Sequence, residues 1–294
     1  MSGGVWQRRQ RSLWQDAVGR FARNRLSVAA SMVAAALIVM ALFAPWLAPT
    51  HYDAQVYSQA WQFPSRAHIM GTDAFGRDVL SRIIYGARVS LSVALIVNAS
   101  ALIIGVPVGA LAGWFGGITD YALMRIVDVM SAIPRLLLAI LMMTVLGSGL
   151  LNIYIVMGVT GWIHIARLVR AQFLTLREQD YITAARGIGA SARHIIVRHL
   201  LPNCATLLIV SLTLDIPQAI MTEAGLSFLG VGVNPPLPSW GKMLNEYLPY
   251  IQTYWYLSTF PAIMIALTMY AFTLMGDGLQ DALNPQSGWR GLIR

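Results

Sequence analysis

Six apolar stretches, each long or nearly long enough to cross a lipid bilayer, limit what this chain can fold into. The first, Leu26 to Leu47, contains no charged residue. As an α-helix its 22 residues would extend roughly 33 Å, which matches a hydrocarbon core of about 30 Å. Only 12% of the 294 residues are charged, about half the share that is usual in soluble proteins. We therefore expect an all-α integral membrane protein.

The other five apolar stretches complete an expected set of six membrane-spanning helices with both termini on one side. They are Ser90 to Trp114, Ile133 to Leu146 with an extension at its N-terminal side, Leu150 to Ala166, Cys204 to Leu229 and Tyr254 to Met275. Cytoplasmic segments of membrane proteins carry an excess of arginine and lysine. If the N-terminus is cytoplasmic, fifteen arginines fall in inner segments, against four arginines and one lysine in outer loops. The net charge of +8 therefore indicates topology rather than nucleic-acid binding.

These spans divide the chain into four parts. Residues 1–25 form a cytoplasmic N-terminal segment, residues 26–89 the first spanning helix with an extracytoplasmic loop, residues 90–285 a core of five spanning helices, and residues 286–294 a cytoplasmic tail. Trp14, Val18 and Phe21 share a helical spacing, which is typical of an amphipathic helix at the membrane surface. A disordered basic tail is the alternative for this first segment.

Three glycines occur at four-residue intervals in the second expected span, at Gly105, Gly109 and Gly113. Small residues at this spacing lie on one helix face and let two helices approach closely in a bilayer. Glycine is also simply common in membrane helices, so the sequence leaves both interpretations open.

The segment "DYITAARGIGASARHIIVRHLLPN", residues 180–203, interrupts the apolar pattern with three arginines, two histidines and two closely spaced glycines. Asp180 is expected to cap a first short helix and Ser191 a second one, with Gly187 and Gly189 between them and Pro202 closing the second. The glycines imitate a dinucleotide-binding motif, but they follow a helix instead of a buried strand. We therefore predict a protruding pair of helices that contacts a soluble partner.

This segment resembles the cytoplasmic loop of ABC importer permeases. Ala184 and Ala185 match the two alanines of the family's Glu-Ala-Ala motif, Gly189 its glycine, and Leu201 with Pro202 its closing pair. Thr183 stands where the family has glutamate, and His199 where it has isoleucine. The stretches "GTDAFGRDVLSRIIYGARVSL", "GLSFLGVGVNPPLPSWG" and "LMGDGLQDALNP" narrow the similarity to the C-type permeases of dipeptide, oligopeptide and nickel importers. The resemblance extends from about Arg25 to Pro285.

The resemblance implies a type I ABC importer permease fold that moves dipeptides or oligopeptides across the inner membrane by alternating access. It implies three kinds of partner: a homologous second permease, two cytoplasmic ATPases that use the ATP, and an extracytoplasmic binding protein. The residues that it assigns to coupling with the ATPases are Thr183, Ala184, Ala185, Arg186, Gly187, Gly189, Leu201 and Pro202. The chain itself is expected to be no enzyme and to bind no cofactor.

Two carboxylates, Asp215 and Glu223, lie near one face of the fifth expected span. Intramembrane carboxylates normally face water or a partner, so these residues line the translocation path or else hydrogen-bond neighbouring helices. The single Cys204 and the scattered His51, His68 and His164 predict no metal site. Peptide is therefore the expected cargo, with nickel or another small solute as an alternative. A stand-alone secondary transporter is a further alternative, although no span is repeated.

Overall fold

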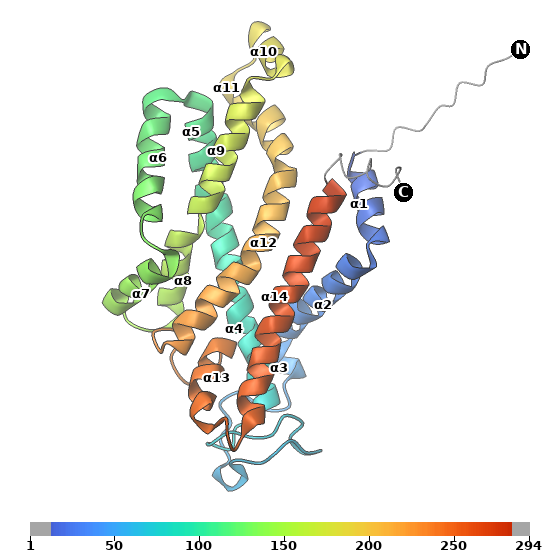
Figure 1. The fold of residues 1–294 in the computed structure, drawn as a ribbon, viewed down its shortest axis with the longest axis vertical. Coiled ribbons are helices and arrows are strands. Elements are labelled where there is room, and N and C mark those ends of the chain that lie inside the picture. The colour runs from blue at the N-terminus through green and yellow to red at the C-terminus, as the bar shows by residue number, and fades with distance from the viewer. Residues whose placement is uncertain (1–12, 284–294) are drawn as a thin grey trace, which may run out of the picture.

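The computed structural model describes residues 13–283, which form a bundle of helices without a β-strand (Figure 1). The helices are α1 (Leu13–Arg23), α2 (Arg25–Leu42), α3 (Ala44–Leu47), α4 (Val79–Ser100), α5 (Val106–Phe115), α6 (Gly117–Ser131), α7 (Arg135–Leu146), α8 (Leu150–Gly161), α9 (Ile163–Arg177), α10 (Asp180–Gly187), α11 (Ala192–Ile195), α12 (Leu201–Phe228), α13 (Trp240–Tyr247) and α14 (Trp255–Leu283). Two π-helical turns, Ala101–Gly105 and Ile196–Leu200, join α4 to α5 and α11 to α12. The predicted all-α class is confirmed.

Five helical segments within the described residues are long and apolar enough to cross a membrane. They are Arg25–Leu42, Val79–Phe115, Leu150–Arg177, Ala192–Phe228 and Trp255–Leu283. Each contains or largely overlaps one of the predicted apolar runs, so five of the six predicted spans are confirmed.

The third predicted span, Ile133 to Leu146 with its N-terminal extension, is present as a broken pair of helices instead of one straight helix. α7 has 12 residues, about 18 Å of helix, which is too short to cross a hydrocarbon core. It pairs with α6 across a break at which the two axes bend by 81°. The cause is Pro134, since a proline disfavours helical geometry in the residue before it. Six spans are reached only when α6 and α7 are taken together as one broken span.

Both ends of the described chain lie at the same end of the bundle. α1 and the last turns of α14 are at the upper end in Figure 1, where α10 and α11 also project. The long segment between α3 and α4 and helix α13 are at the lower end. α1, the end of α14 and the 180–203 segment therefore share one end of the bundle.

The three glycines at four-residue spacing mark a close contact between the second span and α9. A Cβ atom on Gly105 would lie 2.7 Å from the carbonyl oxygen of Trp162, and one on Gly113 would lie 2.6 Å from Cβ of Phe173. A Cβ on Gly109 would collide with the carbonyl oxygen of Ala166. The first of the two interpretations is therefore confirmed: the glycines permit close helix packing.

We expect Gly109→Ala to destabilise the protein by about 1–3 kcal/mol, because backbone atoms of α9 would have to move. Gly158→Ala is the matched control, since its new Cβ would meet Cγ2 of Ile96 at an ordinary 3.8 Å. Alanine there should leave stability unchanged or raise it slightly, through its higher helix propensity. The thermal unfolding midpoints of the purified variants in detergent give the comparison. Equal midpoints for both variants would contradict the packing role of Gly109.

Candidate functional site

The segment 180–203, here called the knob, projects beyond the end of α9 and leads into the first turn of α12 (Figure 1). α10 ends at Gly187, and Gly189 then adopts a φ of +84°, a left-handed conformation that favours glycine. The hydroxyl oxygen of Ser191 accepts a hydrogen bond of 3.3 Å from the backbone N–H of His194, which caps α11. The predicted glycine bend and the predicted serine cap are both present.

Two details of the predicted knob are wrong. The cap of α10 is Gln179, without a side-chain hydrogen bond, while Asp180 is already the first helical residue. The second helix also does not end at Pro202, because the π turn before it connects α11 directly to α12. Pro202 lies in the first turn of α12, next to the change in hydrogen-bond register, where a proline without an N–H is tolerated. The knob is therefore continuous with a spanning helix.

The knob has an inner and an outer face. Ile182 is fully buried in a cluster with Phe173 and Leu200, and the half-buried Ala185 packs against the same cluster. On the outer face, Ile188 is 87% exposed. Six of the predicted coupling residues are also exposed: Thr183, Ala184, Arg186, Gly187, Gly189 and Pro202. Leu201, like Ala185, is half-buried.

One side-chain contact joins the knob to the end of α5. The guanidinium of Arg186 lies over the ring of Trp114, 4.6 Å from its centroid. Nearby, Nη1 of Arg177, the last residue of α9, donates a hydrogen bond of 3.1 Å to the carbonyl oxygen of Gly113. The two contacts hold α10 and the end of α9 against α5. Ile188 was not singled out in the sequence, although a large apolar residue between two glycines is a signal for an exposed contact.

Glu223 and Asp215 differ in their surroundings although they share α12. Glu223 is fully buried, and its carboxylate accepts hydrogen bonds from the hydroxyls of Ser90 (2.9 Å) and Ser227 (2.8 Å), with Ser239 as a further donor. These contacts connect α12 to α4 and to the start of α13. They correspond to the second of the two roles considered, hydrogen bonding to neighbouring helices. Asp215 is half-buried, and no side chain among residues 13–283 donates a hydrogen bond to its carboxylate.

Removing the Glu223 carboxylate should destabilise the protein. In Glu223→Leu, buried serine hydroxyls lose their acceptor, and each unsatisfied group costs about 1–3 kcal/mol. Glu223→Gln keeps one acceptor oxygen and should have a smaller effect. Thermal unfolding of the two variants tests this, and a leucine variant as stable as the glutamine variant would show that the serine contacts contribute nothing.

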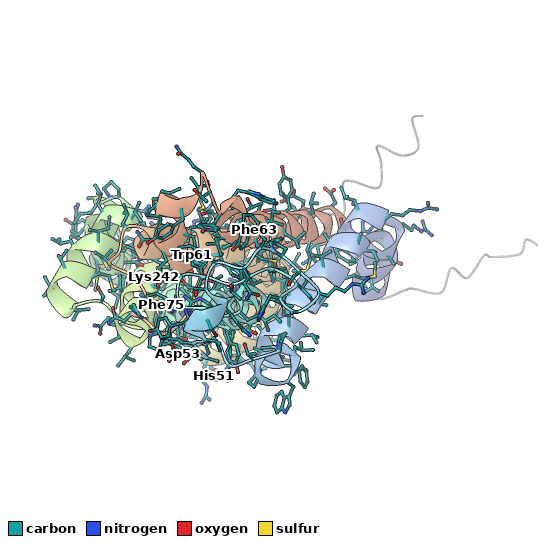
Figure 2. All side chains as sticks on the ribbon, turned by 90° about the horizontal axis from the view of Figure 1, so that it is seen from below. His51, Asp53, Trp61, Phe63, Phe75 and Lys242 are labelled. Atoms are coloured by element: carbon teal, nitrogen blue, oxygen red, sulfur yellow. The ribbon has the colours of Figure 1, made fainter. Side chains whose placement is uncertain are left out.

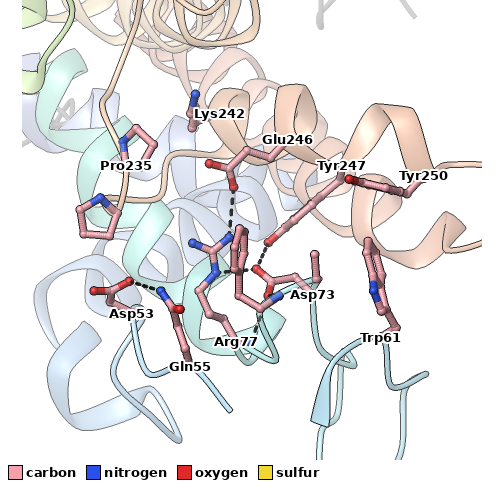
Figure 3. A pocket seen from close by; sticks show the side chains of 13 residues that line it. Asp53, Gln55, Trp61, Asp73, Arg77, Pro235, Lys242, Glu246, Tyr247 and Tyr250 are labelled. Atoms are coloured by element: carbon pink, nitrogen blue, oxygen red, sulfur yellow. Dashed lines mark hydrogen bonds and ion pairs between the residues drawn. The ribbon is translucent and has the colours of Figure 1, made fainter. Parts of the chain in front are cut away.

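An ion-pair network at the opposite end of the bundle was not predicted. Nε of Arg77 lies 2.7 Å from Oδ2 of Asp73, and Nη2 of Arg82 lies 2.9 Å from Oε2 of Glu246. The hydroxyl of Tyr247 donates to Oδ2 of Asp73 at 3.2 Å, and burial raises the pKa of Tyr247. The side chains of Asp73 and Arg82 are fully buried. The network joins the loop before α4 to α13, as Figure 3 shows for Arg77, Asp73, Glu246 and Tyr247.

A pocket of about 480 Å³ opens beside this network. Its lining includes the aromatic rings of Trp61, Phe75 and Tyr250 together with the charged side chains of Asp53 and Lys242 (Figure 3). Figure 2 shows the molecule from below, where Asp53, Trp61, Phe75 and Lys242 lie in the same part of the end face. The guanidinium of Arg77 lies over the ring of Phe75, 4.7 Å from its centroid. Because Arg77 is also paired with Asp73, the ion-pair network fixes this part of the pocket lining.

No group of three or more His, Cys, Asp or Glu side chains that could hold a metal ion occurs in residues 13–283. His68 pairs with Asp78, with 2.9 Å between Nδ1 and Oδ2. His51 instead contacts the rings of Tyr52 and Tyr85.

Sequence comparison relates most of the chain to transport proteins. A family model described as binding-protein-dependent transport system inner membrane component matches residues 105–288, and the N-terminal TM domain of oligopeptide transport permease C matches residues 12–64. The chain is 42% identical to an oligopeptide transport system permease protein of Bacillus subtilis, over 94% of this chain and 90% of the relative. It is 44% identical to a dipeptide transport system permease protein of the same organism, over 94% and 86%. For a glutathione transport system permease protein of Pectobacterium atrosepticum the identity is 40%, over 94% and 92%.

The fold also resembles a solved transporter. A chain of the MetNI methionine ABC transporter in an inward-facing conformation matches with a TM-score of 0.57 and 22% sequence identity, covering 69% of this chain and 96% of that one. This similarity concerns the fold alone.

Proposed function

We propose that this chain, which belongs to the family of binding-protein-dependent transport system inner membrane components, is the permease subunit of an ABC importer for dipeptides or oligopeptides. Its relatives are named for oligopeptide, dipeptide and glutathione transport. All three cargoes are short peptides or a peptide derivative, which favours peptide over nickel as the cargo. The family description, a binding-protein-dependent transport system, favours an ABC importer over a stand-alone transporter. The chain is a membrane component and not an enzyme, so the ATP is hydrolysed by partner subunits.

The observation that carries the coupling role is the continuity of the knob with α12. Residues Ala192–Phe228 form one helical segment of 37 residues, about 55 Å long. A displacement of the knob by closing ATPases is therefore carried along a continuous helical segment to the level of Asp215 and Glu223. A flexible loop at the same place would absorb the movement. Alternating access then follows from tilting this helix against its neighbours.

The proposed assembly contains a second, homologous permease, two cytoplasmic ATPases and an extracytoplasmic binding protein. The exposed Ile188 on the knob would contact an ATPase. The end with the 480 Å³ pocket would face the binding protein. The arginine-rich end with α1, the knob and the end of α14 would lie in the cytoplasm of a cell with an inner membrane, in agreement with the positive-inside rule.

Purification of the tagged chain from its native membrane in mild detergent tests the assembly. We expect a second permease and two ATPases to copurify, with ATP hydrolysis that rises when peptide-loaded binding protein is added. Recovery of the chain without an ATPase, under conditions that preserve other membrane complexes, would contradict the importer function.

A further inference from the structure

A second pocket, here called the polar hollow, lies between three helices in the half of the bundle that carries the knob. Its volume is about 390 Å³, within the range of about 300–1,000 Å³ that is usual for small-molecule sites. α9 contributes Gln172, α14 contributes Gln280, and α12 lines the hollow from Asn203 to Leu214, about 16 Å along the helix axis. Figure 1 shows α12 between α9 and α14. The polar hollow therefore extends from the knob end of α12 towards the middle of that helix.

Four side chains of the lining carry hydrogen-bonding groups that the fold does not use. The side chains that form no hydrogen bond within residues 13–283 are Gln172, Thr206, Ser211 and Gln280. Asn203 donates from Nδ2 to the carbonyl oxygen of His199 at 2.6 Å, but its side-chain oxygen accepts nothing from those residues. Thr213, on α12 but outside the lining, shows the usual arrangement, since its hydroxyl donates to the carbonyl oxygen of Ile209 at 2.8 Å. The polar hollow therefore gathers unused donors and acceptors.

These groups lie on helices that are long and apolar enough to cross a membrane. In hydrocarbon a polar group without a partner is costly, so polar groups within spans face water, a ligand or another helix. Close contacts between spanning helices use small residues, as Gly109 does against α9. The polar hollow instead includes two glutamines and three leucines, whose long side chains keep another helix at a distance. The unused groups therefore fit a ligand better than a further helix.

The chemistry of the lining matches a peptide backbone. The lining residues within 13–283 include no charged side chain. Amide groups both donate and accept hydrogen bonds, and so do hydroxyl groups. A peptide backbone presents one N–H donor and one C=O acceptor for almost every residue. Uncharged groups of this kind bind a backbone without favouring a charged side chain, while Leu207 and Val210 supply apolar contact.

We propose that the polar hollow binds the backbone of the transported peptide in the cytoplasmic half of the translocation path. Gln172 and Gln280 bind its amide groups from α9 and α14, and the hydroxyls of α12 bind it from the third side. The backbone is the part that peptides of every sequence share. This inference rests on the proposed importer function and names residues of its path. They differ from the predicted Asp215 and Glu223, neither of which is among the lining residues.

Engineered thiols in inverted membrane vesicles test whether the polar hollow is open to water and peptide. The vesicles hold the assembled importer with its cytoplasmic side facing the medium. Cys204, the single cysteine of the chain, is 1% exposed and gives little background. A charged, membrane-impermeant thiosulfonate should modify Ser211→Cys and Thr206→Cys at least about tenfold faster than Ile209→Cys, because apolar surroundings suppress the reactive thiolate. Trialanine in the medium should slow both reactions.

Ile209 is the matched control for these thiols. It is an exposed residue of the same helix and is not among the lining residues of the polar hollow. If both Ser211→Cys and Thr206→Cys react as slowly as Ile209→Cys, or if neither assembles, lipid or protein fills the hollow and the proposal is wrong. Fast reactions that trialanine leaves unchanged would also overturn it, since the hollow would then hold water without binding peptide.

One added charge should give the site a preference that it lacks. The complete importer is placed in vesicles with ATP inside, and each tripeptide is supplied at a concentration that saturates the binding protein. The unmodified importer should take up Ala-Lys-Ala and Ala-Glu-Ala at similar rates. Gln172→Glu and Gln280→Glu should each favour Ala-Lys-Ala by about fivefold, as expected for one accessible ion pair. Gln179→Glu is the control, because Gln179 is exposed just beyond α9 and outside the lining.

Equal uptake of both tripeptides by Gln172→Glu and Gln280→Glu would contradict the proposal. So would failure of both variants to assemble, which would assign the glutamines to the packing of the complex. The same preference in Gln179→Glu would show that the effect does not come from the polar hollow. Failure of the unmodified complex to import either tripeptide would instead refute the importer function, and the thiol reactions do not depend on that result.

Discussion

Replacing Ile188 by aspartate is expected to separate this permease from its ATPases while leaving its own fold intact. Ile188 is 87% exposed, so the new charge costs little in the isolated chain. In the assembled importer the side chain would be enclosed by the ATPase surface. Burying a charge without a partner costs about 2 kcal/mol or more, which weakens association by about 30-fold. Peptide-stimulated ATP hydrolysis should fall accordingly.

The control for this variant is Ile69→Asp. Ile69 is also an exposed isoleucine, with 64% of its surface accessible, but it lies in the loop at the other end of the bundle. Its variant should copurify with the ATPases at the normal level. If Ile188→Asp associates normally with the ATPases and shows normal stimulation of ATP hydrolysis, the outer face of the knob takes no part in coupling.

Removing the guanidinium of Arg82 should have the largest effect on stability. The Arg82 side chain is completely buried, and Nη2 lies 2.9 Å from Oε2 of Glu246. In Arg82→Ala the fully buried Asp73 and the partly buried Glu246 lose a compensating charge. Breaking a buried pair by removing one partner costs about 3–5 kcal/mol, which lowers the unfolding midpoint by roughly 6 °C or more for a domain of this size.

Arg66→Ala provides the comparison for Arg82. Arg66 lies in the loop before α4 and is exposed, and its replacement should change the midpoint by less than about 2 °C. Thermal unfolding of both variants in the same detergent measures the difference. If Arg82→Ala unfolds together with Arg66→Ala, the network at this end of the bundle does not hold the loop to α13.

The features that could be predicted from the sequence are local in the chain. Long apolar runs identify spanning helices because the hydrocarbon core fixes their length. The bend at Gly189 and the cap at Ser191 follow from the conformational preferences of single residues. The glycine spacing in the second span indicated a close contact, but only the structure identified α9 as the partner.

The features that were missed depend on residues far apart in the chain. Arg82 and Glu246 are separated by 164 positions, and no local pattern indicates that they meet. The position of α7 was missed for the same reason, because it depends on the packing of α7 against α8 and α12. The break at Pro134 and the continuity at Pro202 show that one residue type has opposite effects. Inside a helix, a proline disfavours helical geometry in the residue before it and so interrupts the helix. In the first turn of a helix a proline is tolerated, because its missing N–H would have no partner there.

ATP-driven uptake in reconstituted vesicles tests the importer function most directly. The complex is placed in vesicles with or without internal ATP, and radiolabelled dipeptide is added together with the binding protein. Accumulation that requires both ATP and the binding protein, and that is lost in Ile188→Asp, is the result expected of a peptide importer permease. Accumulation by this chain alone, driven by an ion gradient without ATP, would contradict it.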